Sequence, residues 1–197
     1  METRRAVRAR LSSPDFPCLP NVLVKCPAAL LIFFDTIGAL KLRLVCSSAK
    51  EAVEAHPWRD EETRINGRPQ DWRACFPYAR AANFRGSTVF TTEHFPLLAG
   101  LLSLNVSECP HLSNAAFPYL RGIQKLEMGE CRQITDAAFI HLRGIKELDM
   151  RNCNQATITD AALDHLAGIR KLRMFGCRPA LIASAQQRGS PVDLSEY

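Results

Sequence analysis

An internal repeat is the feature that most restricts how this chain can fold. Four successive units of similar sequence each begin with a glycine: Gly100, Gly122, Gly144 and Gly168. Each unit carries one cysteine at the same place, and these are separated by 22, 22 and 24 residues: Cys109, Cys131, Cys153 and Cys177. A more divergent unit precedes them, because 91–96 aligns with 113–118 and Ser87 stands at the cysteine position. Because each unit can bury its faces only against its neighbours, the repeat predicts a stack of similar units.

Each unit has two halves. The first half predicts a short strand in which Ile123, Leu126 and Met128 face inward and the residues between them face outward. The second half predicts a helix, because Thr135 can accept a hydrogen bond from the first helical turn and Asp136 suits the positive end of the helix dipole. Equivalent hydroxyl residues open the neighbouring helices: Ser113 and Thr159. The fold class is therefore α/β, and the spacing L-x-x-L-x-L-x-x-C predicts a leucine-rich-repeat solenoid.

The four repeated cysteines are interpreted as a structural ladder: Cys109, Cys131, Cys153 and Cys177. A buried thiol is a small apolar group with a weak S–H donor for the backbone of the turn. Neighbouring strands lie close enough for disulfides, but no export signal is evident, and one cysteine in each repeat favours reduced thiols in the cytoplasm or nucleus. The spacing lacks the clustered pattern of a metal site, so neither a metal nor a cofactor is expected.

Residues 16–57 lack the repeat period and predict a small all-α segment of short helices punctuated by prolines. A helical segment of this size cannot bury much core alone, so it must pack on the repeats or on a partner. Residues 1–15 predict a flexible basic arm, 58–86 a connecting and capping segment, 87–188 the repeats and 189–197 a C-terminal tail. Within the connector, Trp58, Trp72 and Phe76 can cover the open end of the stack, which must be covered whatever the protein does.

The helical segment resembles the F-box, a three-helix motif that docks on the adaptor of SCF-type ubiquitin ligases. The resemblance rests on the following residues, with Trp58 closing the segment: Leu19, Pro20, Leu40, Leu44, Val45 and Cys46. An F-box followed by cysteine-containing leucine-rich repeats is the arrangement of a substrate-receptor family. The resemblance implies that these six residues bind the SCF adaptor and that the repeats bind a target protein, whose identity it does not give. The chain would then act as a monomer within a complex.

Outward-facing strand residues of the repeats are the candidate target-binding positions on a concave face: Lys125, Glu127, Glu147, Asp149, Arg151, Lys171, Arg173 and Phe175. One interpretation is that opposite charges on adjacent strands simply pair, which contributes roughly 0–1 kcal/mol for each exposed pair. The other is a polar recognition surface, centred where Arg151, Arg173 and Phe175 combine residue types that are enriched at binding hot spots.

Other function classes find little support in the composition. The net charge of +5 is spread along the chain, so no nucleic-acid-binding surface is expected. The most apolar stretch, 28–45, contains Asp35, Lys41 and Arg43, so no membrane span is expected. Because no catalytic motif is present and the histidines are dispersed, the protein is not expected to be an enzyme. The alternative to a ligase receptor is a leucine-rich-repeat scaffold in which the N-terminal helices serve only as a cap.

Overall fold

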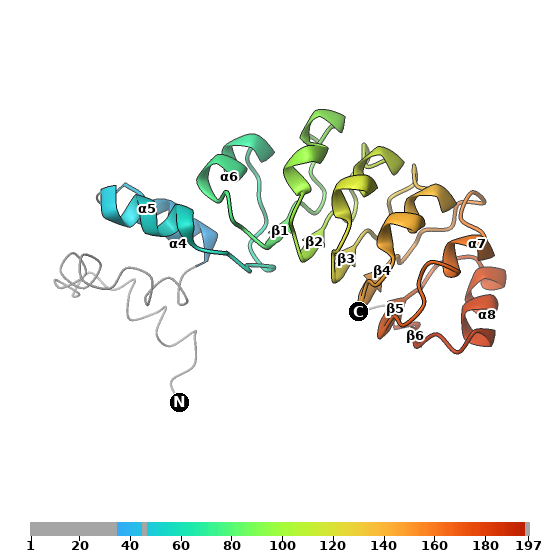
Figure 1. Ribbon diagram of the computed structural model, residues 1–197. Coiled ribbons are helices and arrows are strands. Elements are labelled where there is room, and N and C mark those ends of the chain that lie inside the picture. The colour runs from blue at the N-terminus through green and yellow to red at the C-terminus, as the bar shows by residue number, and fades with distance from the viewer. Residues whose placement is uncertain (1–34, 45–46, 196–197) are drawn as a thin grey trace.

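The computed structural model describes residues 35–44 and 47–195, apart from the side chain of Ser48. Its centre is a sheet of six parallel strands arranged in chain order. The strands are β1 (Ala81–Asn83), β2 (Ser103–Asn105), β3 (Lys125–Glu127), β4 (Glu147–Asp149), β5 (Lys171–Arg173) and β6 (Val192–Asp193). Figure 1 shows the strands along the inside of a curved stack and the helices along its outside. The chain is therefore an α/β protein, with one strand and one helix for each repeat.

The register places equivalent residues of consecutive repeats beside one another. Leu104 aligns with Leu126, and Leu126 with Leu148, and all three are buried beneath the sheet. The sheet extends further than the repeats do, because β1 lies within the predicted connector 58–86 and β6 within the predicted tail 189–197. Both additions pair with the backbone of an outermost repeat, whose N–H and C=O groups would otherwise face solvent.

The predicted helix in the second half of each repeat is confirmed in position, but its type varies. Three are 3₁₀ helices: η1 (Thr92–Leu98), η2 (Asn114–Leu120) and η3 (Asp136–Leu142). Two are α-helices: α7 (Asp160–Leu163) and α8 (Pro179–Gln187). Pro96 and Pro118 lie inside η1 and η2, where proline removes a backbone donor that a regular α-helix would use. The buried apolar face of these segments includes Phe117 and Phe139.

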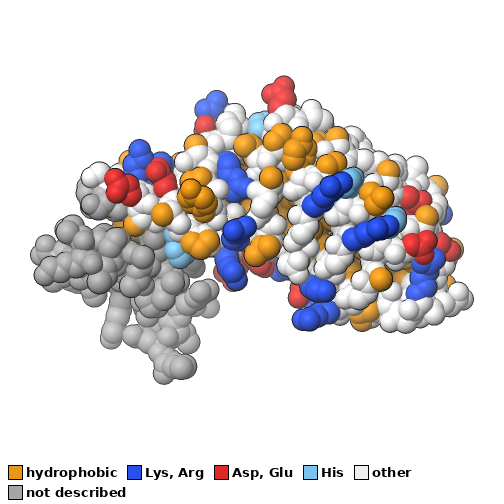
Figure 2. Space-filling model, in the orientation of Figure 1, with side chains coloured by type: hydrophobic (Ala, Val, Ile, Leu, Met, Phe, Trp, Pro, Cys, Tyr) orange, Lys and Arg blue, Asp and Glu red, His pale blue; other side chains and the backbone are white. Residues whose placement is uncertain are grey.

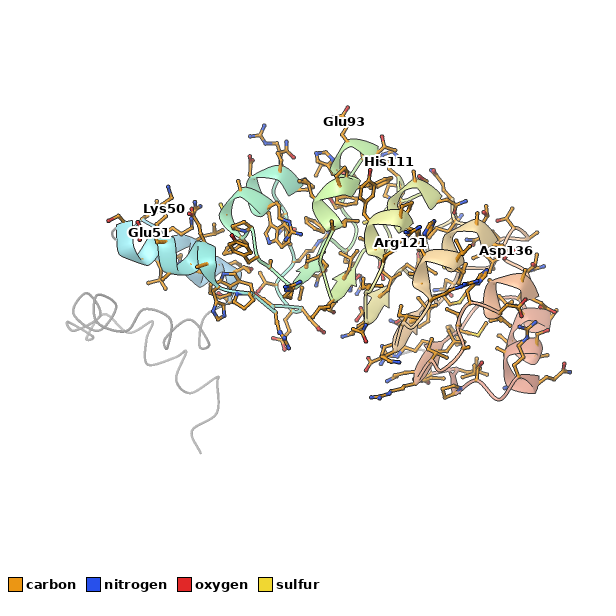
Figure 3. The ribbon with its side chains drawn as sticks, viewed as in Figure 1. Lys50, Glu51, Glu93, His111, Arg121 and Asp136 are labelled. Atoms are coloured by element: carbon orange, nitrogen blue, oxygen red, sulfur yellow. The ribbon has the colours of Figure 1, made fainter. Side chains whose placement is uncertain are left out.

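The residues predicted to open the helices hold that position. Thr135 and Thr159 are N-cap residues whose side chains accept from the N–H two residues further on, whereas the N-cap Ser113 makes no such bond. Asp136, labelled in Figure 3, does more than suit the helix dipole. Its carboxylate accepts from the backbone N–H of Thr159 at 2.7 Å and from its hydroxyl at 2.6 Å. The side-chain amide of Asn114 accepts from the backbone N–H of Thr135 at 3.0 Å and donates to its hydroxyl at 2.7 Å, so these polar groups join consecutive repeats.

The N-terminal helices pack against the first strand through a series of aromatic side chains. These helices are α4 (Thr36–Leu42), α5 (Ser47–Ala55) and α6 (Pro69–Cys75). Trp58 donates its indole N–H to the carbonyl of Val53 at 2.8 Å and contacts Phe76 edge to face. Trp72 contacts Phe84, which follows β1, in the same geometry. Trp58, Trp72 and Phe76 are all buried, so the predicted capping residues lie between the helices and the first strand.

The cysteine ladder has the predicted structural chemistry. The four repeated cysteines are free thiols and are buried. Each donates its S–H to a backbone carbonyl in the preceding repeat, at 3.0–3.4 Å: Cys109 to Phe84, Cys131 to Val106, Cys153 to Met128 and Cys177 to Met150. Burial raises the pKa of Cys131 and of Cys153 to about 12 and that of Cys177 to about 11, so these thiols stay protonated at neutral pH.

Candidate binding face of the sheet

The inner face of the sheet carries the side chains predicted to contact a target. The register places Lys125 beside Glu147 and Glu147 beside Lys171, in one row across β3, β4 and β5. A second row contains Glu127, Asp149, Arg173 and Asp193. A third row lies just beyond the ends of the strands. There the backbone N–H of the residue before each cysteine donates to a carbonyl in the next repeat: Glu130 donates to Arg151, and Asn152 donates to Phe175. Arg151 and Phe175 therefore hold equivalent positions on neighbouring repeats. The structure therefore brings all eight predicted residues onto one face.

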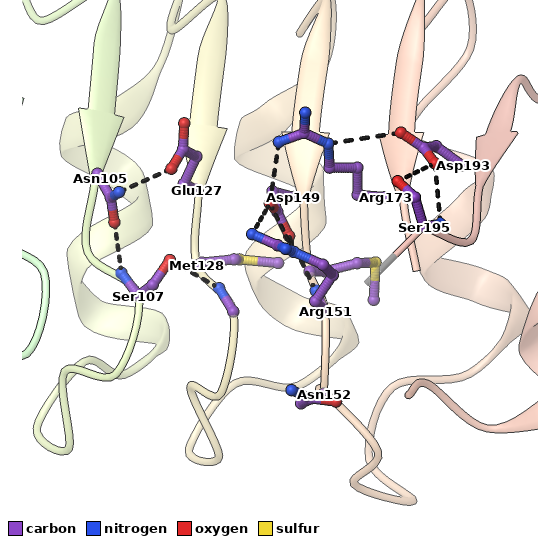
Figure 4. Close-up of polar contacts among 12 residues, drawn as sticks. Asn105, Ser107, Glu127, Met128, Asp149, Arg151, Asn152, Arg173, Asp193 and Ser195 are labelled. Atoms are coloured by element: carbon purple, nitrogen blue, oxygen red, sulfur yellow. Dashed lines mark hydrogen bonds and ion pairs between the residues drawn. The ribbon is translucent and has the colours of Figure 1, made fainter. Parts of the chain in front are cut away.

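Polar contacts on this face form a connected network (Figure 4). Asp149 accepts from the guanidinium of Arg151, with three N···O distances of 2.9–3.0 Å, and from Arg173 at 3.5 Å. Arg173 also lies 3.5 Å from Asp193, whose carboxylate accepts from Ser195. The hydrogen bond to Asp149 is the main reason why the pKa of Arg151 is raised. Two arginines are thus held in fixed positions by two carboxylates.

Asp149 differs from the other residues predicted to contact a target, because it is buried and binds the backbone. It is only 4% exposed, and its carboxylate accepts from the backbone N–H of Arg151 at 3.1 Å. Asn105 makes the same contact with the N–H of Ser107, and Asp193 with that of Ser195. Asp149 is therefore one of a row of residues that end the strands by satisfying a backbone donor. A target would meet the arginines above it rather than Asp149 itself.

Lys125 pairs with partners that the repeat pattern does not contain. Its ammonium lies 2.6 Å from Glu61, in the connector, and 3.3 Å from Glu127 on the same strand. Burial lowers the pKa of Lys125, but the hydrogen bonds and charges of Glu61 and Glu127 outweigh it and raise the pKa. None of the ion pairs within the described part of the chain joins Lys125 to Glu147, the pair expected from adjacent strands. The expected pairing of Asp149 with Arg173 is confirmed.

The face offers a surface rather than a pocket. A hollow between the first two rows has a volume of about 10 Å³, which is room for about one water molecule. A wider, open depression of about 310 Å³ lies where β1 to β4 begin. Within residues 35–44 and 47–195, no group of three His, Cys, Asp or Glu side chains is placed to hold a metal ion. In the same part of the chain, no helix is long and apolar enough to cross a membrane.

The residues predicted to bind an adaptor are described only in part. Leu19, Pro20, Val45 and Cys46 lie outside the described residues. Leu40 lies on α4 and is 42% exposed, and Leu44 follows the helix and is 88% exposed. Ala39 and Leu42, on the same helix, are buried. The helix therefore has one face in the core and one apolar face in solvent.

Some residues of the face are not apparent from the repeats. Asp193 follows the last repeat, and Glu61 precedes the first. For Asp193 a signal exists, because Asp193 and Ser195 have the same spacing as Asn105 and Ser107, which also end a strand. For Glu61 no local signal exists, since its partner Lys125 lies 64 residues away.

No protein-family model and no curated protein matches the chain.

Proposed function

We propose that the chain is a protein-binding module of the leucine-rich-repeat type that serves as the substrate-recognition subunit of an SCF-type ubiquitin ligase. The repeat reading is supported by the recurrence of strand, buried cysteine and helix in register. The binding role is supported by an inner face whose charged side chains are held in place by ion pairs. In this proposal the target protein contacts Arg151, Arg173 and Phe175 of that face.

The observation that carries the adaptor interaction is the exposed apolar side of α4. Ile37 is 54% exposed, Leu40 42% and Leu44 88%, although the opposite side of the helix is buried. Neighbouring exposed apolar side chains at one end of a molecule are typical of a protein-binding surface. The F-box resemblance places adaptor contacts at Leu40 and Leu44, and their exposure leaves them accessible to such a partner.

A pull-down of the full chain with purified SCF adaptor tests this role. We expect the intact chain to retain the adaptor and the double variant Leu40→Ser, Leu44→Ser to lose it. The control is Ile140→Ser, which removes from η3 an apolar side chain that is 49% exposed, close to the 42% of Leu40. Because all three side chains are exposed, the variants should keep the circular dichroism spectrum of the intact chain. Failure of the intact chain to retain any adaptor would overturn the proposal.

A second candidate function is a repeat scaffold without ligase association, favoured by how firmly the helices join the first repeats. The carbonyl of Trp58 accepts from the N–H groups of Arg80 and Ala81, at 2.6 and 3.1 Å. Thr36, at the start of α4, donates to Asp60 in the connector at 2.9 Å. In this case the helices complete the fold as a cap. A scaffold of this kind would not retain the adaptor, whereas a ligase receptor would, so the same pull-down separates the two functions.

A further inference from the structure

The sheet has two edges, and their charged side chains differ in how they are paired. The edge where the strands begin, which we name the basic edge, carries two cations from the connector and four from three turns between repeats: Arg59, Arg80, Arg121, Arg143, Lys146 and Arg170. Figure 2 shows a series of Lys and Arg side chains across this side of the molecule, with few Asp and Glu between them. Figure 3 labels one member, Arg121, from the same viewpoint.

Backbone hydrogen bonds place part of the basic edge in one row. The N–H of Arg170 donates to the carbonyl of Lys146 at 2.8 Å, and that of Lys146 donates to Gln124 at 2.9 Å. Gln124 is joined to Leu102, and Leu102 to Arg80, in the same way. The spacing of these side chains is therefore set by the spacing of neighbouring strands, about 4.8 Å.

The cations of the basic edge lack acidic partners. Among the ion pairs formed by the described residues, none includes a member of this set. Arg121 instead donates to a ring nitrogen of His141 at 3.4 Å, and Arg80 donates to the carbonyl of Gly100 at 3.0 Å. The pKa of Arg73, beside this edge, is lowered first by burial and then by the charge of Arg80. Like charges thus gather here without being neutralised.

The open depression of about 310 Å³ lies on this edge, and its lining includes Arg59, Arg80 and Lys146. Two carboxylates also line it, namely Glu61, which binds Lys125, and Glu147. A polymer with a negative charge on every unit, such as a nucleic acid, would bring phosphates against these carboxylates. A polypeptide can place an uncharged or basic residue there and acidic residues beside the cations.

We propose that the basic edge is a docking surface for an acidic segment of a partner protein, held in extended form along the row of cations. The arginines suit this role because a guanidinium binds a carboxylate through two parallel hydrogen bonds. The surface adjoins the first row of the inner face, because Lys125 and Glu147 also line the depression, and it includes no residue of α4. It deepens the protein-binding role proposed above by giving the chemistry of a partner, and it does not depend on the adaptor.

Fluorescence anisotropy of the full chain with a fluorescein-labelled peptide of alternating glutamate and serine, which can place uncharged residues beside Glu61 and Glu147, tests the inference. A peptide of about ten residues is long enough in extended form to follow the row. We expect binding that weakens as the salt concentration rises from about 50 to about 200 mM, because exposed charges are screened. The triple variant Arg143→Glu, Lys146→Glu, Arg170→Glu should weaken binding at least about tenfold.

A control of equal net charge removes three cations elsewhere on the surface: Lys41→Glu, Lys50→Glu, Arg132→Glu. We expect it to change the affinity less than about twofold. An oligothymidylate of the same charge as the peptide should bind more weakly than the peptide. The inference is wrong if the intact chain does not bind the peptide, if the control loses as much affinity as the edge variant, or if the oligothymidylate binds more tightly. These results are independent of the adaptor pull-down, so either proposal can fail without the other.

Discussion

The polar groups at the two edges of the sheet differ in whether they are bonded within the protein. Where the strands end, which we name the cysteine edge, each repeated thiol binds a carbonyl in the preceding repeat, and Asn105, Asp149 and Asp193 each accept from a backbone N–H. Where the strands begin, none of the six cations of the basic edge forms an ion pair with an acidic side chain among the described residues. The cysteine edge is occupied by the contacts that hold the repeats together. The basic edge is left available to a partner.

A glycine on each edge gives the largest expected contrast in stability. Gly176 and Gly122 both have left-handed backbone, with φ of +70° and +86°. A Cβ on Gly176 would clash with the side-chain oxygen of Asn152, whereas nothing lies within 4 Å of a Cβ on Gly122. We expect Gly176→Ala to lower the free energy of unfolding by about 2–4 kcal/mol, from strain and overpacking together. Gly122→Ala should cost about 1 kcal/mol, from backbone strain alone.

Urea unfolding of both variants provides the measurement. The double variant Gly176→Ala, Asn152→Ala should recover part of the loss, because it removes the oxygen that the new Cβ would meet. Equal losses for the two glycines would mean that the cysteine edge is no more tightly packed than the basic edge.

The next contrast comes from alkaline pH, which should affect the cysteine edge. The thiol of Cys153 has a pKa of about 12 in the folded chain, against an ordinary value of 9.0. Because the folded thiol keeps a proton that the unfolded thiol releases, its contribution to stability is complete below about pH 9 and is lost progressively as the pH rises toward 12. Between pH 8 and pH 10 we expect this single thiol to account for a loss of about 1 kcal/mol.

Comparison of the intact chain with Cys153→Ala isolates that loss from the titration of other groups. Urea unfolding at the two pH values should show the stability advantage of the intact chain shrinking by that amount. An advantage that is the same at both pH values would contradict the expected protonation of the buried thiol.

What the sequence predicts correctly depends on whether a contact repeats. The strand around Leu126 and the hydrogen-bonded thiol of Cys131 recur in each unit, and a hydroxyl N-cap such as Thr135 recurs in three of the four, so one pattern predicts them. The 3₁₀ geometry is not predicted, because it depends on how seven residues fit between fixed turns rather than on their apolar period.

Contacts made once are the ones that the sequence leaves undetermined. The pair of Glu61 and Lys125 joins the connector to the second strand after it, and no local pattern connects these residues. The basic edge is missed for the same reason, since Arg59 and Arg80 precede the repeats and the other four cations come from three different turns. An even charge along the chain is compatible with an uneven charge in space, and here folding gathers six cations along the basic edge.

The smallest expected effect concerns a histidine beside the basic edge. The pKa of His141 is lowered first by burial and then by the positive charge of Arg121, which donates to its ring at 3.4 Å. In the variant Arg121→Gln the charge is removed but a donor is kept, so we expect the pKa of His141 to rise part of the way toward its ordinary value of 6.5. A titration of the imidazole resonances by NMR measures the shift. Arg143→Gln is the matched control, because Arg143 donates to His165 and should leave the pKa of His141 unchanged. A shift of equal size in both variants would show that the histidine responds to the summed charge of the edge rather than to its one bonded arginine.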